Sequence, residues 1–387
     1  MKIDTLKKGI SYLRYYGVYA VENTMLYGGK MLGRFLFPLV LIFGKVGNIE
    51  TFYPESILKN KTRIFFEQLW YILKTGEINK YYHRFGFDRK SKSDFKNYVP
   101  WLVFTNARNR RNQFPSNPTY DPYNYICMLR DKFVFEAFCK RVGIKTPSNI
   151  GMINDGNFHV IDEPRTIPLN NIVQLEIDAF LKRNVSYGGG MSNNVMPLRI
   201  ENGIIYLNNR LVELDDFKEF IGSDCWVLQE RITNQHEALS KFHPSSINTL
   251  RIVTVKVGST IEVISSNLRI GKNGRHADNV SSGGVSIPVA NGKLEEWGFI
   301  RSGLGVKIDK HPNTKVVFEN YEIPFWDKII DTVKNAHSLF YGIHSIGWDV
   351  CLTDNGIKLI EGNDNWDTID AQISGYGKNL YLKYFKD

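Results

Sequence analysis

The segment 347–363 constrains the fold of this 387-residue chain more than any other. Two short apolar runs flank the sequence Thr-Asp-Asn-Gly at 353–356, which is a strong local signal for a β-hairpin. In such a hairpin Asp349 and Glu361 lie near one another on opposing strands, and Asn363 projects to the same face as Glu361. The segment therefore predicts a hairpin with polar side chains gathered on one face.

Two carboxylates and an amide oxygen on one face of a hairpin have the chemistry of a cation site. Carboxylates left unpaired repel each other, and oxygen ligands from few protein groups suit Mg²⁺ that is bound through substrate phosphates. A hairpin with solvated polar residues is the alternative, but the flanking Gly347-Trp348 and Leu359-Ile360 indicate burial. We therefore predict Asp349, Glu361 and Asn363 as metal ligands.

Residues from 131 onward alternate short helical and extended patterns. The apolar spacing predicts helices at 131–142, 213–221 and 325–341, and strands at 172–182, 225–231, 247–257, 261–270 and 347–361. Because strands and helices intermix without a strict βαβ alternation, the pattern favours an α+β (mixed α/β) fold over a barrel or a sandwich.

The first hundred residues read mostly as helix, with breaks near 44–47, Asn60 and Gly76, and they carry the excess charge. The chain has a formal net charge of +9, and residues 1–100 hold 17 Lys and Arg against 8 Asp and Glu. The stretch 105–122 is rich in Asn, Arg and Pro, which predicts a connector and a domain boundary. We expect the basic segment 1–120 to meet an anionic surface, with a solvated basic face as the alternative.

Membrane crossing is not expected from this sequence. The longest apolar run, 35–43, has nine residues including a proline and is too short to span a bilayer. Its basic flanks suit an interfacial position, with a buried helix end as the alternative. The four cysteines are far apart and the first residues lack the layout of a secretory signal. We expect a cytoplasmic protein, with peripheral contact at the inner face of the cell membrane as an option.

A second polar segment combines a lysine with glycines. An apolar strand ends at Lys182, and the following loop contains Gly188, Gly189 and Gly190. Backbone amides without side chains can approach phosphate oxygens closely, and a nearby ammonium supplies charge. A phosphate clamp is one interpretation, and a glycine-rich hairpin tip is the other.

A third segment is the apolar strand 226–230, which ends in Gln229 and Glu230. Main-chain donors and acceptors beside apolar groups form the kind of edge that holds an adenine, although an ordinary strand end explains the pattern equally well. No signature of a nucleic-acid-binding module is present, so nucleic acid is not an expected partner.

Taken in order, these segments resemble the ATP-grasp superfamily, and more narrowly the sugar-transfer associated ATP-grasp family found with polysaccharide biosynthesis. Asp131-Lys132 resembles the first nucleotide lysine motif, 180–182 the second lysine strand, 186–192 the glycine-rich phosphate loop and 229–232 the adenine-binding hinge. Asp349, Glu361 and Asn363 resemble the metal triad, and 243–251 and 278–284 resemble segments of the narrower family. The resemblance covers roughly 125–375.

The resemblance implies an ATP-grasp fold whose two α+β subdomains, 121–240 and 241–387, clamp ATP. The mostly helical, basic region 1–120 precedes them in the chain. It implies nucleotide contacts by Lys132, Lys182, Gly188, Gly189, Gly190, Gln229, Glu230, Ile232, His236 and Glu237. It implies substrate contacts by Asn248, Asp278 and Asn279, and stabilisation of the transferring phosphoryl group by Arg251 and Arg269. Lys182 is followed by Arg183 where the family commonly has proline, and the ribose contact stays open between His236 and Glu237.

The function implied is that of an ATP-dependent carboxylate-amine ligase. It would use ATP and one or two Mg²⁺ ions to form an acyl phosphate and then an amide. An amino acid and a sugar, either a uronic acid or an amino sugar, are the expected partners, in the biosynthesis of a surface polysaccharide such as a capsule. The alternatives are an ATP-grasp kinase acting on a sugar hydroxyl and a non-catalytic glycan-binding module.

Overall fold

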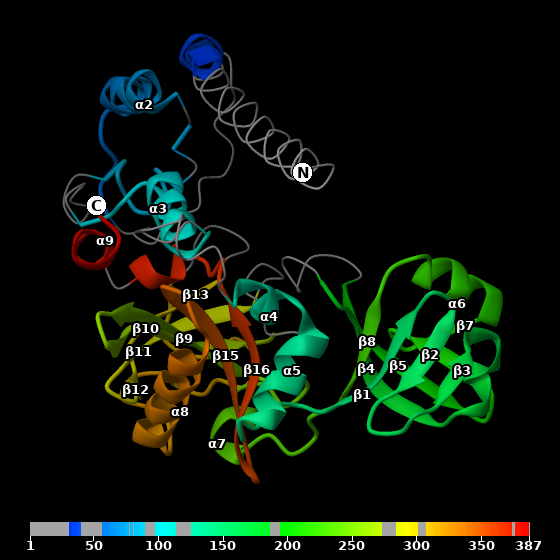
Figure 1. Cartoon of the computed structure of the whole chain (residues 1–387). Helices are drawn as coiled ribbons and strands as arrows, with labels where there is room; N and C mark the ends of the chain where they lie inside the picture. Colours follow the sequence, from blue (N-terminus) through cyan, green and yellow to red (C-terminus); the bar gives the residue numbers. More distant parts are fainter. Residues whose placement is uncertain are drawn as a thin grey trace, which may run out of the picture. The chain divides into compact units, whose positions relative to one another are not determined.

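The chain forms two compact units, residues 1–95 and 96–387 (Figure 1). This computed structural model describes residues 31–39, 56–76, 78–79, 81–89, 97–113, 125–185, 194–272, 284–300, 307–373 and 376–386.

The described part of the first unit contains a helix at 31–39 and the helix α2 (Lys61–Thr75). The side chain of Asn60 caps α2 by accepting a hydrogen bond from the Thr62 amide at 2.9 Å. Gly76 ends the helix with a φ of 76°, a conformation that glycine adopts without strain. The predicted breaks at Asn60 and Gly76 are confirmed, and the one at 44–47 lies outside the described residues.

The second unit contains two antiparallel sheets. The first has the strand order β3-β2-β1-β8-β4-β5-β6-β7 and is covered by the helix α6 (Leu214–Ile221). Its strands are β1 (Asn149–Asn154), β2 (Asn157–Val160), β3 (Thr166–Pro168), β4 (Ile177–Arg183), β5 (Val195–Glu201), β6 (Ile204–Leu207), β7 (Arg210–Val212) and β8 (Trp226–Glu230). We call this half the first lobe.

The second sheet has the order β14-β13-β11-β10-β9-β15-β16, with β12 paired to β11. Its strands are β9 (Thr249–Val257), β10 (Thr260–Ile270), β11 (Val285–Ala290), β12 (Lys293–Leu294), β13 (Gly298–Ile300), β14 (Lys307–Ile308), β15 (Ser345–Thr353) and β16 (Gly356–Asn363). The short helix α7 (Glu237–Ser240) precedes the sheet. We call this half the second lobe.

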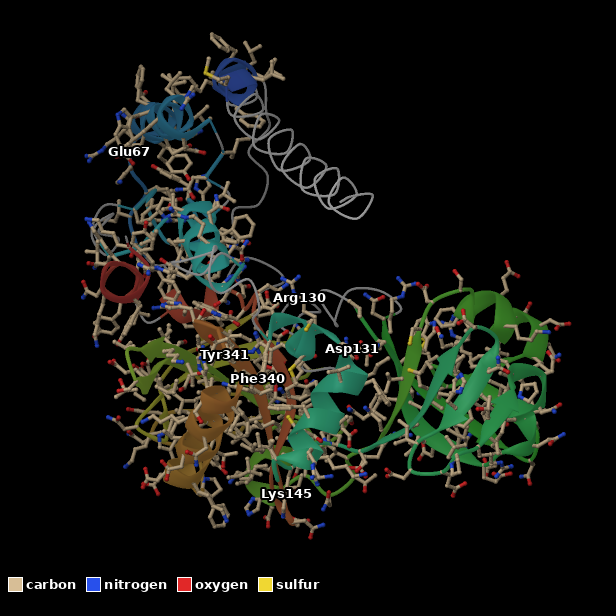
Figure 2. The ribbon with its side chains drawn as sticks, in the orientation of Figure 1. Glu67, Arg130, Asp131, Lys145, Phe340 and Tyr341 are labelled. Atoms are coloured by element: carbon tan, nitrogen blue, oxygen red, sulfur yellow. The ribbon has the colours of Figure 1, made fainter. Side chains whose placement is uncertain are left out.

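One face of the second sheet is closed by an apolar core. The helix α8 (Trp326–Leu339) covers this face, and α4 (Ile126–Arg130) and α5 (Lys132–Arg141) pack beside it. Phe340, which is labelled in Figure 2, follows α8. Its ring stacks on Phe135 of α5 with ring centroids 6.0 Å apart. Because side chains alternate along a strand, the residues between the core positions point to the opposite face.

That opposite face is covered in part by elements from both ends of the unit. The helices α3 (Trp101–Gln113) and α9 (Gly377–Tyr384) and the short helix η3 (Asp370–Gln372) contribute to a cluster with Phe104, Trp366 and Phe385. The cluster rests on Val253 and Val255 of β9, whereas the intervening core positions face α8. Polar side chains of β9, β10, β15 and β16 lie on another part of the same face.

The predicted α+β fold is confirmed, and two local predictions are wrong. Residues 106–112, interpreted as a connector, lie within α3, because Asn112 bonds both main-chain groups of Ser345 and holds this polar helix on β15. The first part of the predicted strand 172–182 belongs to the short helix η1 (Leu169–Gln174), whose Leu169 and Ile172 pack into the first-lobe core. The three-segment domain division stays a prediction.

Candidate active site

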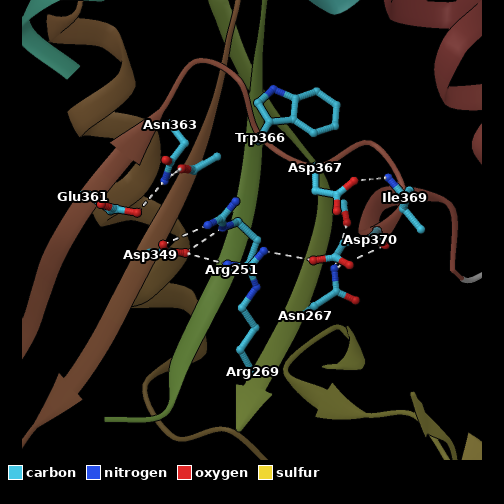
Figure 3. Close-up of polar contacts among 12 residues, drawn as sticks. Arg251, Asn267, Arg269, Asp349, Glu361, Asn363, Trp366, Asp367, Ile369 and Asp370 are labelled. Atoms are coloured by element: carbon cyan, nitrogen blue, oxygen red, sulfur yellow. Dashed lines mark hydrogen bonds and ion pairs between the residues drawn. The ribbon is translucent and has the colours of Figure 1, made fainter. Parts of the chain in front are cut away.

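A row of polar side chains crosses four strands of the second sheet (Figure 3). Asn267 of β10 pairs with Arg251 of β9, Arg251 pairs with Asp349 of β15, and Asp349 pairs with Glu361 of β16. Cross-strand partners point to the same face, so the four side chains lie next to one another on the face opposite α8. We call Asn267, Arg251, Asp349 and Glu361 the polar row.

A β-bulge puts Glu361 on this face. Asp349 pairs with Glu361 and Val350 pairs with Leu359, so Ile360 is an extra residue in β16. An extra residue reverses the alternation beyond it. Leu359 therefore points into the apolar core while Glu361 points to the polar row, and Asn363 follows two residues later on the same face.

The predicted metal triad is brought together by the hairpin. The Asn363 amide donates a 3.1 Å hydrogen bond to Glu361 Oε1, and Glu361 lies opposite Asp349. Asp349 is only 8% exposed and accepts two bonds from Arg251, at 2.6 and 2.8 Å. Arg269 Nη1 lies 3.5 Å from Asp349 Oδ1. Burial alone would raise the pKa of Asp349, but the two guanidinium groups outweigh it and hold the pKa below its ordinary value.

The donor set of the triad fits Mg²⁺. Within the part of the chain that the structure describes, no group of three or more His, Cys, Asp or Glu side chains could hold a metal ion. The triad is of another kind, with two carboxylates and one amide, and all three can offer the oxygen ligands that Mg²⁺ prefers. Few protein ligands suffice when nucleotide phosphates complete the coordination. The assignment stays a prediction.

Lys132 and Lys182 both lie near this triad. Burial lowers the pKa of Lys132, and the charges of Glu361 and Asp131 oppose that shift. Burial lowers the pKa of Lys182 to about 8, again opposed by Glu361. Two lysines that both interact electrostatically with Glu361 supply positive charge of the kind that suits phosphate oxygens. A polyanion bound beside Lys182 would raise the pKa of this lysine, because negative charge stabilises the protonated amine.

Asn184 holds the amino end of α5, which carries Lys132. Its side chain accepts a hydrogen bond from the Phe133 amide at 3.0 Å and donates one to Asp131 Oδ2 at 2.9 Å. Asp131 in turn caps α5 by accepting a bond from Val134. Asn184 follows β4 directly, so it joins the two lysine motifs. The sequence pattern did not single it out.

The predicted adenine edge lies at the junction of the lobes. Gln229 accepts a 2.5 Å bond from Lys182 Nζ and donates one to Asn149 at 3.2 Å, and Asn149 is a further site residue that the sequence pattern missed. Glu230 forms a 2.5 Å ion pair with Lys358 of β16, which joins the first lobe to the second.

The residues after β8 differ in their surroundings. Ile232 is half-buried, the His236 ring accepts a bond from the Ala238 amide and caps α7, and Glu237 is exposed in the first turn of that helix. His236 thus has a structural use, while Glu237 has its carboxylate in solvent. The ribose contact stays open between the two.

Asn248 is reinterpreted as a structural residue. Its side chain is fully buried, and its Oδ1 accepts bonds from Ser246 Oγ and the Gly271 amide at 3.0 and 3.3 Å. Its Nδ2 donates to the main-chain oxygens of Leu239 and His243 at 2.9 and 3.0 Å. An amide with this set of internal partners has no polar atom left for a substrate. The predicted residues Gly188, Gly189, Gly190, Asp278 and Asn279 lie outside the described residues.

Comparison with family models identifies the class of protein. Residues 109–382 match the model described as sugar-transfer associated ATP-grasp. The chain belongs to this family, and the two lobes are those of an ATP-grasp fold. None of the curated proteins matches the sequence.

Solved structures show only a distant likeness. An L-amino acid ligase from Bacillus licheniformis is 12% identical with a TM-score of 0.37, covering 67% of this chain and 48% of its own. D-alanine-D-alanine ligase from Helicobacter pylori is 13% identical with a TM-score of 0.36, covering 67% and 59%. N5-carboxyaminoimidazole synthase from Aspergillus clavatus, in complex with ADP, is 10% identical with a TM-score of 0.34, covering 65% and 52%. The chain spans about half the length of these proteins.

Proposed function

We propose that this protein is an ATP-dependent carboxylate-amine ligase that works through an acyl phosphate. The observation that carries the proposal is the polar row, which places Asp349 and Glu361 side by side with two arginines within reach. Glu361 interacts electrostatically with both Lys132 and Lys182, and Asp349 also interacts with Lys182. Carboxylates for a cation, together with lysines and arginines for phosphate oxygens, are the charges that suit a bound nucleoside triphosphate and its cation.

In this proposal the protein residues bind and orient the reactants. Lys132 and Lys182 neutralise phosphate oxygens, and Arg251 and Arg269 hold the acid or the transferring phosphoryl group. Mg²⁺ held by Asp349, Glu361 and Asn363 would supply charge neutralisation at the β- and γ-phosphates.

The bonds balance in two steps. A substrate carboxylate oxygen attacks the γ-phosphorus, the bond from that phosphorus to the β-phosphate oxygen breaks, and ADP leaves with an acyl phosphate formed. An amine then attacks the acyl carbon, inorganic phosphate leaves, and the amine loses its proton to solvent. No nucleophile from the protein is required.

The substrates proposed are an amino acid and a sugar that carries either a uronic carboxyl or an amino group. The family description, sugar-transfer associated, supports a role in the assembly of a surface polysaccharide. Phosphorylation of a sugar hydroxyl is the competing outcome, because the same arrangement of charges serves both reactions.

Trapping with hydroxylamine distinguishes the two outcomes. We expect the protein, incubated with ATP, Mg²⁺ and a pool of sugar acids and amino acids, to release ADP and to convert hydroxylamine into a hydroxamate. The physical reason is that an acyl phosphate reacts with hydroxylamine whereas a phosphate ester does not. ADP release without any hydroxamate, together with a phosphorylated sugar in the mass spectrum, would support the kinase instead.

We further propose that the first unit contacts an anionic lipid surface. Of the 24 exposed large apolar residues in the described ranges, ten lie between 31 and 73. On α2 the exposed side chains of Phe66, Trp70 and Leu73 form one stripe, and Lys74 lies 4.7 Å from the Trp70 ring. Arg34 donates to the main-chain oxygen of Leu73 at 2.9 Å, which holds the exposed helix 31–39 beside α2.

The basic residues beside this apolar face favour an anionic lipid surface as its partner. The exposed ends of α2 carry Lys61, Arg63 and Lys74. The one acidic residue of the helix, Glu67, contacts Lys59 and Tyr82 and also forms a 2.8 Å ion pair with Arg63. An apolar stripe with an aromatic ring and basic flanks is typical of a helix that lies in an anionic membrane interface. None of the helices described is long and apolar enough to cross a bilayer.

Binding to vesicles tests this surface. We expect the full chain to bind phosphatidylcholine vesicles that contain phosphatidylglycerol, and to release from them as salt is raised. Phe66→Ser combined with Trp70→Ser should weaken binding at least about tenfold, because two large apolar groups no longer enter the interface. Leu211→Ser, at an exposed apolar position of the second unit, is the matched control. Vesicle binding by the double variant that equals that of the wild type would contradict the proposal. A double variant that loses a concentration-dependent dimer of the wild type, and not vesicle binding, would contradict it too.

A further inference from the structure

Asp370 contacts the polar row from the segment that follows β16 (Figure 3). Its Oδ2 lies 2.9 Å from Arg269 Nη2, and its main-chain oxygen accepts a 3.5 Å bond from the Asn267 side chain. Asp370 is 8% exposed and Arg269 is 7% exposed. The carboxylate is therefore not a solvated surface group, because it is buried against two neighbouring side chains of β10.

Arg269 lies between two carboxylates that hold it unequally. It is 2.9 Å from Asp370 but 3.5 Å from Asp349. Asp349 has its two short bonds with Arg251, at 2.6 and 2.8 Å. Since the strength of a charged hydrogen bond falls with distance, Arg251 is the main partner of Asp349 and Asp370 is the main partner of Arg269. Of these two carboxylates, Asp370 therefore has the greater influence on the position of Arg269.

The segment that carries Asp370 is itself fixed from two directions. Arg130 of α4 holds Asp364 through two bonds, at 3.0 and 2.6 Å. The side chain of Gln372 accepts a 2.8 Å bond from the Val99 amide, just before α3. A carboxylate anchored at both sides has little freedom to follow a displaced arginine, so it can define where the guanidinium lies.

We propose that Asp370 is a positioning residue that holds Arg269 at the reacting phosphoryl and carboxylate oxygens. This inference rests on the proposed ligase function. A cation and its nucleotide beside Asp349 would compete with Arg269 for that carboxylate and repel the guanidinium. Asp370 supplies a second negative charge that is not part of the triad, so Arg269 keeps its place while Asp349 changes partners.

The test is the isosteric change Asp370→Asn, which keeps the shape and removes the charge. We expect kcat for ADP release to fall about 10- to 100-fold, the loss usual when the partner that orients an active-site group is removed. The KM for ATP should be nearly unchanged, because Asp370 touches Arg269 and not the nucleotide. Asp370→Glu should recover part of the rate. In an Arg269→Lys background, Asp370→Asn should have little further effect, because the two residues act as one unit.

Asp367→Asn is the matched control. Asp367 lies in the same segment and its carboxylate accepts a bond from the Ile369 amide, which an asparagine oxygen can also accept. We expect its kcat to stay at the wild-type level. Wild-type kcat in Asp370→Asn, or effects of Asp370→Asn and Arg269→Lys that simply multiply, would overturn the inference.

A second readout separates this inference from the ligase proposal. A double-mutant cycle for Asp370→Asn and Arg269→Lys, measured by urea unfolding, needs no substrate, and a positive coupling between the two sites is expected. No ADP release by the wild-type chain with any acceptor would defeat the ligase proposal while the cycle still reports the contact. Zero coupling in the cycle would overturn the role of Asp370 whatever the activity.

Discussion

Glu361→Gln is expected to lower kcat about 100- to 1,000-fold, the range found when one preorganised electrostatic group is removed from a reacting centre. Glu361 lies opposite Asp349, accepts a bond from Asn363 and opposes the lowering of the pKa of both lysines by burial. Glutamine preserves the size and one oxygen but removes the charge that a divalent cation needs. The affinity for ATP should change much less, because the lysines and the hinge still bind the nucleotide. Single-turnover ADP formation and calorimetric titration with ATP measure the two quantities.

Lys358→Gln is a suitable comparison for the Glu361 variant. Lys358 is on the same strand and the same face but contacts Glu230 of the first lobe. Its loss should affect ATP binding more than kcat. Ordinary turnover in Glu361→Gln would remove the triad from the mechanism.

Arg251→Met is expected to reduce the free energy of unfolding by about 3–5 kcal/mol, the cost of leaving one member of a buried ion pair without its partner. Asp349 is 8% exposed, and Arg269 at 3.5 Å cannot replace the two short bonds from Arg251. Urea unfolding followed by tryptophan fluorescence measures the change, since Trp348 and Trp366 are buried near the network.

The same variant should alter the pH dependence of stability. The pKa of Asp349 is lowered in the folded protein, so its contribution is present above the unfolded pKa of about 4 and is lost as the pH falls through the folded pKa. The difference between the wild type and Arg251→Met should therefore be largest above about pH 4 and should shrink on further acidification.

Two controls bound the effect of Arg251→Met. Combining it with Asp349→Leu should recover much of the stability, because no buried charge is then left unpaired. Arg199→Met removes a half-exposed ion pair with Glu201 and should change the free energy of unfolding by less than about 1 kcal/mol. A double variant as unstable as Arg251→Met alone would show that the ion pair is not the cause.

The parts of this protein that the sequence predicts well are those set by local chemistry. The hairpin 345–363 follows from its turn residues and the apolar runs that flank them, and the limits of α2 follow from the breaks at Asn60 and Gly76. The strands β8, β9 and β10 lie where the apolar runs predict them. Each of these signals acts within a few residues.

The parts that the sequence does not predict depend on contacts between distant residues. Asp370 lies 101 residues from Arg269, and no spacing rule links them. Asn112 lies in a polar stretch that the sequence predicts as a connector, and its bonds to Ser345, 233 residues away, are among the tertiary contacts that hold this stretch as a helix. Asn248 reads as a substrate residue until its internal partners are known. Tertiary hydrogen bonds of this kind override local preference.

The extra residue at Ile360 determines which face of the hairpin its neighbours occupy. Because of this residue, Leu359 points into the apolar interior and Glu361 points to the polar row, although only one position separates them. If β16 paired residue by residue with β15 and had no bulge, Leu359 and Glu361 would point to the same face, so that either a carboxylate would enter the apolar interior or an aliphatic side chain would lie in the polar row. The bulge is therefore as important to the arrangement of the polar row as the identity of the residues beside it.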